Sequence, residues 1–236
     1  MIVLILIIIA VVITIAITNQ NKIEEQNRPQ DEKDRIKELN KRILASQFGF
    51  ADKGETGENY IELQILNLNI PKKIIRNAYI PHNGDTAEID LILITEYGIY
   101  VIESKNYSGW IFGSANNKYW TQSKNKHSRY RFYNPIRQNR THINALSKYL
   151  NIEKIKFSSY IVFGNNSVLK NVPPNTNEYC IMYEGQINEY IIRDIQLKNK
   201  LFTEEYIEKI YNLLLPTTNV SYETKQKHIE HAKQYK

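Results

Sequence analysis

The sequence predicts a mixed α/β domain with one central sheet covered by helices. Three observations favour this class. Short runs rich in Ile, Val and Tyr, typical of strands, are interspersed with longer segments whose apolar residues recur at helical spacing. The two kinds of segment are mixed along the chain rather than segregated. Apolar residues make up 42% of the 236 residues, which is enough for a domain-sized core.

The N-terminal segment precedes this domain and differs from it. Residues 2–18 read IVLILIIIAVVITIAIT and contain no charged residue. As a helix they span about 25 Å, close to the ~30 Å hydrocarbon core of a bilayer. No basic region precedes the segment and no small-residue cleavage site follows it, which argues against a signal peptide. We therefore expect a single-pass transmembrane anchor at residues 2–18, in contact with the lipid bilayer of the cell membrane.

The residues after this segment set its expected orientation and the domain boundaries. They are rich in Lys and Arg, which places the rest of the chain in the cytoplasm. The single cysteine, Cys180, excludes an internal disulfide and agrees with a reducing compartment. Residues 19–50 form a polar juxtamembrane segment, either a short helix or a solvated stalk. The globular domain is expected at 51–216 and a polar tail at 217–236.

Each element of the domain has a local signal. Asn134 and Pro135 open a helix, because Asn caps helix N-termini and Pro is favoured at the first helical position. Thr203 caps the last helix, and Pro216 ends it. The expected elements are a helix at 55–66, strands at 72–80, 88–95 and 98–105, a hairpin formed by 110–113 and 118–120, a helix at 134–150, strands at 157–164 and 178–183, and a helix at 203–215.

Two of these strands, at 88–95 and 98–105, carry charged residues within apolar runs. A two-residue turn at 96–97 places Asp90 opposite Glu103 and Glu88 opposite Lys105. Because residues opposed in this way share a face, the four charged side chains then gather on one patch of the sheet.

A second register of these two strands is compatible with the sequence. A three-residue loop with Gly98 in a bulge would oppose Asp90 to Ser104. We prefer the first register because it alone gives the two carboxylates a common purpose.

Two carboxylates this close repel each other and lose hydration inside a sheet. A divalent cation relieves both costs, since hard cations such as Mg²⁺ take one or two carboxylates and complete their shell with water and phosphate oxygens. Lys105 beside the ion would orient a water or stabilise phosphate charge, as in metal-assisted phosphodiester hydrolysis. The alternative is a charge network that closes the end of a hairpin.

Several motifs together resemble a known family. They are Gly54-x-x-Gly57-Glu58, Ile89-Asp90, Glu103-Ser104-Lys105 within IE-x-K-N-Y-x-G, and Asn134-Pro135-x-x-Gln138. From residue 54 to 150 the chain resembles the NERD (nuclease-related) domain family of the PD-(D/E)xK nuclease superfamily. The resemblance implies a restriction-endonuclease-like mixed central sheet flanked by helices, and hydrolysis of phosphodiester bonds with Mg²⁺ or Mn²⁺.

The resemblance also implies roles for individual residues. Asp90, Glu103 and Glu58 would be metal ligands, with Lys105 as the catalytic lysine and Gln138 pointing into the site. Glu88 departs from the family pattern, which has glutamine there. Its charge either recruits a second metal or ties up the lysine, so a catalytically inactive module of the same fold, which binds nucleic acid or protein at the membrane, is the alternative to a nuclease. His142, one turn after Gln138, is expected to be a surface or packing residue.

A basic stretch follows the strand pair. Residues 106–152 contain no Asp or Glu, and aromatic residues alternate with the basic ones. Lys and Arg neutralise phosphates, and exposed rings stack on bases. The expected nucleic-acid-binding residues are Lys118, Lys124, Lys126, Arg129, Arg131, Arg137 and Arg140. Anionic lipid headgroups are the alternative partner. The sequence as a whole thus predicts a membrane-anchored, metal-dependent nuclease acting on DNA.

Overall fold

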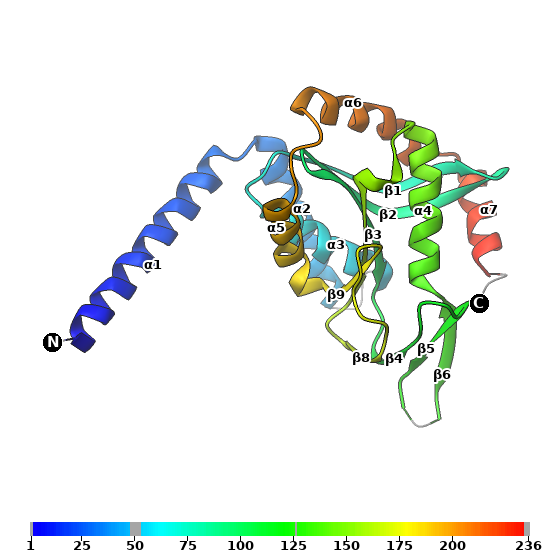
Figure 1. Ribbon diagram of the computed structural model, residues 1–236, viewed down its shortest axis with the longest axis horizontal. Helices are drawn as coiled ribbons and strands as arrows, with labels where there is room; N and C mark the ends of the chain where they lie inside the picture. The colour runs from blue at the N-terminus through cyan, green and yellow to red at the C-terminus, as the bar shows by residue number, and fades with distance from the viewer. Residues whose placement is uncertain (1, 48–52, 126, 234–236) are drawn as a thin grey trace.

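The computed structural model describes residues 2–47, 53–125 and 127–233 (Figure 1). Strands form two sheets in this part of the chain rather than the single sheet expected. The first sheet has the order β1-β2-β3-β7-β9, with β1 Lys72–His82, β2 Asp85–Thr95, β3 Gly98–Lys105, β7 Phe157–Phe163 and β9 Cys180–Tyr183. The second has the order β6-β5-β4-β8, with β4 Gly109–Phe112, β5 Tyr119–Ser123, β6 Arg129–Tyr133 and β8 Ser167–Asn171.

The second sheet arises because the chain leaves the first sheet after Lys105. β4 then pairs with β5 and β8 instead of extending β3. The expected hairpin is therefore present but gains two strands, β6 and β8, that the sequence analysis missed. The mixed α/β class itself is confirmed.

The described helices are α1 Ile2–Asn27, α2 Gln30–Gln47, α3 Lys53–Leu66, α4 Pro135–Leu150, α5 Ile187–Leu197, α6 Glu204–Leu214 and α7 Tyr222–Lys233. Four of them, α3, α4, α5 and α6, cover the two faces of the first sheet, whereas α1 projects away from it (Figure 1). One core cluster packs α4 and α6 against β1, β2 and β3. A second packs α3 and α5 against the opposite face. A third, around Trp120 and Phe163, joins the two sheets.

The N-terminal helices differ from their predicted roles. Among the described residues no helix meets the length and apolarity needed to cross a membrane, so the anchor predicted at 2–18 is not supported. Its apolar run ends at Thr18, and α1 continues into polar and charged residues such as Lys22. The segment predicted to be juxtamembrane contains α2, which is not a solvated stalk, because Leu39 and Ile43 are buried. The localisation stays a prediction that the structure does not test.

The predicted register of the strand pair is confirmed for the residues that pair. β2 pairs with β3 from Leu91↔Ile102 to Thr95↔Gly98, across the two-residue turn at 96–97. The bulged alternative is therefore wrong. The predicted oppositions of Asp90 to Glu103 and of Glu88 to Lys105 lie beyond the last pair and stay predictions.

β1 and β2 change face at the level of Asp90. Opposite this residue, Asn77 in β1 adopts a left-handed backbone conformation with φ of 50°, which Asn tolerates better than most residues. Ile89 and Ile92, three residues apart, pack into the same core cluster, although strict alternation would put them on opposite faces. The reversal lies between them, at the residue that the sequence analysis singled out as a metal ligand.

Candidate functional site

The middle of β2 and the end of β3 carry the carboxylates and the lysine expected from the sequence. Asp90 Oδ2 accepts a hydrogen bond of 2.7 Å from the backbone N–H of Ser104. Lys105 Nζ donates to Glu103 Oε1 and forms an ion pair with it. The Glu103 side chain is only 1% exposed and that of Lys105 14%. The two strands thus bring both predicted ligands and the predicted catalytic lysine together in a largely buried position.

Helix α4 covers these residues from one side. Gln138 Oε1 accepts a hydrogen bond of 3.3 Å from Lys105 Nζ, as the predicted role of Gln138 requires. One turn later, His142 Nδ1 lies 3.3 Å from Glu103 Oε2. His142 is buried beside Glu103, so of its two expected roles, surface and packing, the surface role is wrong.

Two asparagines of the same helix fix its position. Asn134 Oδ1 caps the helix by accepting from the N–H of Ile136, and its amide donates to the carbonyls of three loop residues, Ser114, Ala115 and Asn117. Asn139 is fully buried, and its amide donates to the Val101 carbonyl at 2.8 Å and to Ser159 Oγ at 2.9 Å. These bonds tie α4 to β3 and β7, which holds Gln138 and His142 over the candidate site. The role of Asn139 was not predicted.

Helix α3 supplies the third predicted carboxylate, Glu58, which is held by an ion-pair network. Arg76 Nη2 donates to Glu58 Oε2 at 3.0 Å, and Arg76 Nη1 donates to Glu62 Oε2 at 3.0 Å and to Asn59 Oδ1 at 2.7 Å. Arg35 of α2 contacts both oxygens of Glu62, at 2.7 and 2.9 Å. Glu58 is therefore connected to α2 through Arg76 and Glu62, neither of which the sequence analysis identified.

Burial and mutual repulsion shift the pKa values of the carboxyls at this site. Burial, with a contribution from Asp90, raises the pKa of Glu58 to about 7, although Arg76 opposes the shift. Burial and the Glu103 charge raise the pKa of Asp90 well above its ordinary value. Burial also raises the pKa of Glu103, even beside Lys105. The site thus holds more carboxyl groups than its cations neutralise.

In Lys105 the neighbouring charges, and not burial, decide the direction of the pKa shift. Burial disfavours the charged ammonium, but the adjacent Glu103, together with Tyr107 and Asp90, outweighs burial and raises the pKa of Lys105.

Glu88 accepts a hydrogen bond of 2.8 Å from the hydroxyl of Tyr79, its cross-strand neighbour in β1. Glu88 adds a further negative charge that disfavours ionisation of Glu58, Asp90 and Glu103.

The site has a donor set that fits a hard cation, but it is not a closed cage. Within the described residues no three His, Cys, Asp or Glu side chains form a group that could hold a metal ion. Glu103 Oε2 is nevertheless buried and accepts no hydrogen bond from the described part of the chain. Asp90 and Glu103 are therefore the pair that could bind an ion whose remaining ligands are water and substrate oxygens. Glu58 as a third ligand stays a prediction.

The predicted nucleic-acid-binding residues lie apart from the carboxylates, on the second sheet, its loops and α4. Those that the structure describes, Lys118, Lys124, Arg129, Arg131, Arg137 and Arg140, are exposed. Arg140 is paired with Glu178 at 2.9 Å and so offers less free charge than predicted. Lys126 lies outside the described residues.

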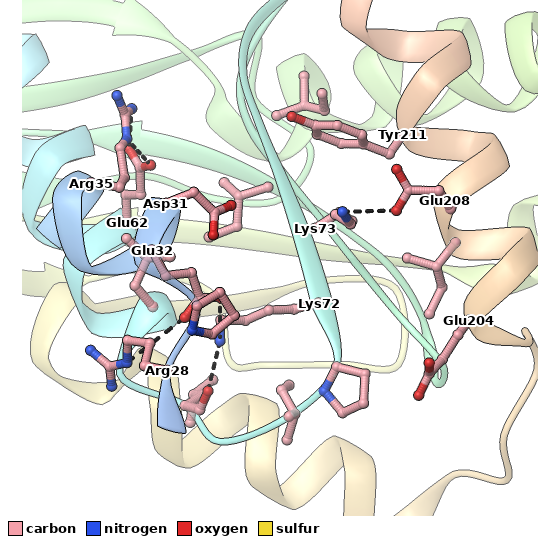
Figure 2. Close-up of a pocket in the computed structure, with 18 of the residues that line it drawn as sticks. Arg28, Asp31, Glu32, Arg35, Glu62, Lys72, Lys73, Glu204, Glu208 and Tyr211 are labelled. Atoms are coloured by element: carbon pink, nitrogen blue, oxygen red, sulfur yellow. Dashed lines mark hydrogen bonds and ion pairs between the residues drawn. The ribbon is translucent and has the colours of Figure 1, made fainter. Parts of the chain in front are cut away.

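A charged groove of about 1060 Å³ lies elsewhere, between α2, β1 and α6 (Figure 2). Figure 2 shows Lys73 joined to Glu208, at 2.8 Å, and Arg35 joined to Glu62. Lys72 lies 3.3 Å from Glu32. Since its charges are balanced and the predicted catalytic residues do not line it, the groove is not the candidate site.

Comparison with known proteins points to one family. Residues 53–164 match the family described as the nuclease-related domain, NERD. The chain is also similar to an uncharacterized protein of Bacillus anthracis, with 32% identity over 190 residues that cover 76% of this chain and 83% of the relative. No solved structure matches the chain significantly. The family match spans every element from α3 to β7, which includes Glu58, Asp90, Glu103, Lys105 and Gln138.

Proposed function

Because the chain belongs to the nuclease-related domain family, we propose that it is a divalent-metal-dependent phosphodiester hydrolase that acts on nucleic acid, with DNA as the first substrate to test. One observation supports the proposal: Asp90 in the middle of β2 lies near Glu103 and Lys105 at the end of β3, where Glu103 Oε2 is buried, has His142 Nδ1 at 3.3 Å and accepts no hydrogen bond from the described residues. Such an oxygen is stabilised by a cation.

The residues would divide the chemistry as follows. Asp90 and Glu103 would hold Mg²⁺ or Mn²⁺, and such an ion would supply positive charge for the scissile phosphate and a water of lowered pKa. Lys105 keeps its proton, because its pKa is raised, and acts as a positive hydrogen-bond donor rather than as a base. Gln138 accepts from Lys105 and directs the ammonium. His142 orients Glu103 from the other side.

A second function is favoured by the ion pairs already present. Arg76 neutralises Glu58 and Lys105 neutralises Glu103, so the fold satisfies part of its charge without a metal. A module that binds nucleic acid or a protein without cleaving would retain this arrangement. Salt-sensitive binding of nucleic acid with no cleavage under any divalent ion supports this alternative.

Cleavage assays with DNA and RNA substrates in Mg²⁺, Mn²⁺ and EDTA distinguish the nuclease from the module that binds without cleaving. We expect metal-dependent cleavage by the wild type and a loss of roughly 100- to 1000-fold in Lys105→Ala, the range for removal of one positioned hydrogen-bond donor. Asp90→Asn should lose both cleavage and metal binding in calorimetric titration. Glu208→Gln, which removes an exposed carboxylate from the Lys73 pair in the groove, is the matched control and should be fully active. Cleavage that survives both Asp90→Asn and Lys105→Ala rejects the proposal.

A further inference from the structure

The second sheet has one face buried against the first sheet and one face open. Ile111, Trp120 and Phe132 of β4, β5 and β6 lie in the core between the sheets. By strand alternation their neighbours point outward. These outward residues include Trp110, Phe112, Tyr119, Arg131, Tyr133 and Lys170, and we call their surface the aromatic face.

Rings are unusually accessible on the aromatic face. Trp110 is 52% exposed, whereas Trp120, the other tryptophan, is 1% exposed. A large aromatic ring left open to water costs free energy unless a ligand covers it. Two ring pairs form, Trp110 with Phe112 at 6.4 Å and Tyr119 with Tyr133 at 6.3 Å between centroids.

Cations accompany these rings. Lys170 Nζ lies 5.3 Å from the centroid of Trp110, and the Arg131 guanidinium lies 4.8 Å from that of Tyr119. The sequences of the four strands contain no Asp or Glu. Alternating rings and cations, with no acidic residue in the strands, complement a polyanion whose units also carry flat aromatic groups.

Lys170 was not part of the predicted basic stretch, because it lies on β8, which follows that stretch by many residues. The parallel pairing of β8 with β4 brings Lys170 and Val168 beside Trp110. Sequence proximity alone could not reveal this contact, because it depends on which strands are neighbours in the second sheet.

We propose that the aromatic face binds single-stranded nucleic acid, with a base stacked on Trp110 and phosphates held by Lys170 and Arg131. Unpaired bases offer free ring faces, while bases within a duplex are stacked on each other. Lys105 and Trp110 are five residues apart, no more than about 18 Å of chain, so a bound strand lies near the candidate site (Figure 1). This inference rests on the proposed function only for the choice of nucleic acid as ligand.

The test uses the full chain in EDTA, so that cleavage plays no part. Unlabelled oligo-dT and oligo-rU of about 16 nucleotides are added while intrinsic tryptophan fluorescence is recorded. Because Trp120 is buried, quenching reports a base on Trp110. We expect both single strands to quench, and matched duplexes to quench much less. Trp110→Phe should retain affinity, measured by anisotropy of a labelled strand, but lose the quenching.

Alanine substitutions on the aromatic face measure how much each side chain contributes to single-strand affinity. Trp110→Ala should weaken single-strand binding about 5- to 150-fold, the range for one stacked base, and leave duplex binding unchanged. Lys170→Ala should weaken it by about 2- to 5-fold. The matched controls on other surfaces, Tyr222→Ala, whose ring is 75% exposed, and Lys209→Ala, whose ammonium lies over Tyr206, should bind as the wild type does.

Several results would overturn the inference: no quenching by either single strand, equal losses on single strands and duplexes, or quenching by anionic vesicles alone. Thermal melts of each variant separate lost binding from lost folding. The proposed nuclease function fails separately, because quenching is measured in EDTA and does not require cleavage. A protein that quenches but never cleaves would refute only the nuclease.

Discussion

Two charged regions lie on either side of Arg76, and they differ in the balance between acidic and basic side chains. The groove of Figure 2 balances its charges, with Arg28, Arg35, Lys72, Lys73 and Arg76 facing Asp31, Glu32, Glu62, Glu204 and Glu208. The candidate site does not: Glu58, Glu88, Asp90 and Glu103 are accompanied by the cations Arg76 and Lys105. A balanced cluster holds helices and strands together, whereas an acidic excess in a buried place requires a further cation.

Glu62 joins the two regions, and its removal should have the largest effect. Its side chain is 4% exposed and binds both Arg35 and Arg76. In Glu62→Ala two guanidinium groups lose a buried partner, so we expect a loss of about 3–5 kcal/mol in the free energy of unfolding, measured by urea denaturation. Arg42→Ala, which breaks exposed pairs on the same helix α2, should cost far less. Equal costs in the two variants would mean that the network has no special role.

The acidic excess should make the metal-free protein less stable as the pH rises. The pKa of Glu58 is about 7 when folded, above its ordinary 4.5, so its carboxyl is charged less readily in the folded state. Its stabilising contribution is present below pH 4.5 and is lost as the pH rises through about 7. We expect a decrease on the order of 1–3 kcal/mol, which Glu58→Gln reduces. Added Mg²⁺ should restore more stability at pH 8 than at pH 5, and an equal effect at both would contradict the comparison.

Removing a carboxylate from the site should stabilise the metal-free fold. Asp90→Asn keeps an oxygen that can accept from the Ser104 N–H but removes a charge that burial and Glu103 oppose. At pH 8 we expect a gain of roughly 1–2 kcal/mol in chemical denaturation, together with loss of the stabilisation by Mg²⁺. Destabilisation instead would show that Asp90 is a structural acceptor, as the carboxylates of the groove are.

How much of this could be predicted from the sequence depends on the distance over which each signal acts. The turn at 96–97 and the register of β2 against β3 follow from local alternation, and the helix start at Asn134 follows from its cap. The positions of Gln138 and Glu58 came from the family resemblance. The residues that fix helices α3 and α4 in place were not predicted: Arg76, Glu62 and Asn139 act through contacts between elements, which neither periodicity nor spacing encodes.

The errors have a similar origin. The second sheet was reduced to a hairpin because β6 and β8 are short and become strands only when β5 and β4 pair with them. His142 was expected to be a surface or packing residue. An isolated histidine in a sequence does not show that its helix will place it beside a buried carboxylate. The apolar segment at 2–18 was interpreted from hydropathy alone.

The groove offers the smallest effect and the sharpest contrast with Asp90. Lys73 and Glu208 form a pair whose side chains are 40% and 49% exposed. Because exposed pairs contribute little, Glu208→Gln should lower the free energy of unfolding by less than about 0.5 kcal/mol, with no change in the response to Mg²⁺. Both variants exchange one carboxylate for its amide, so charge removal is matched and only the surroundings differ. If Glu208→Gln stabilised the protein as much as Asp90→Asn, the gain would reflect net charge, and the acidic excess around Asp90 and Glu103 would not mark a cation site.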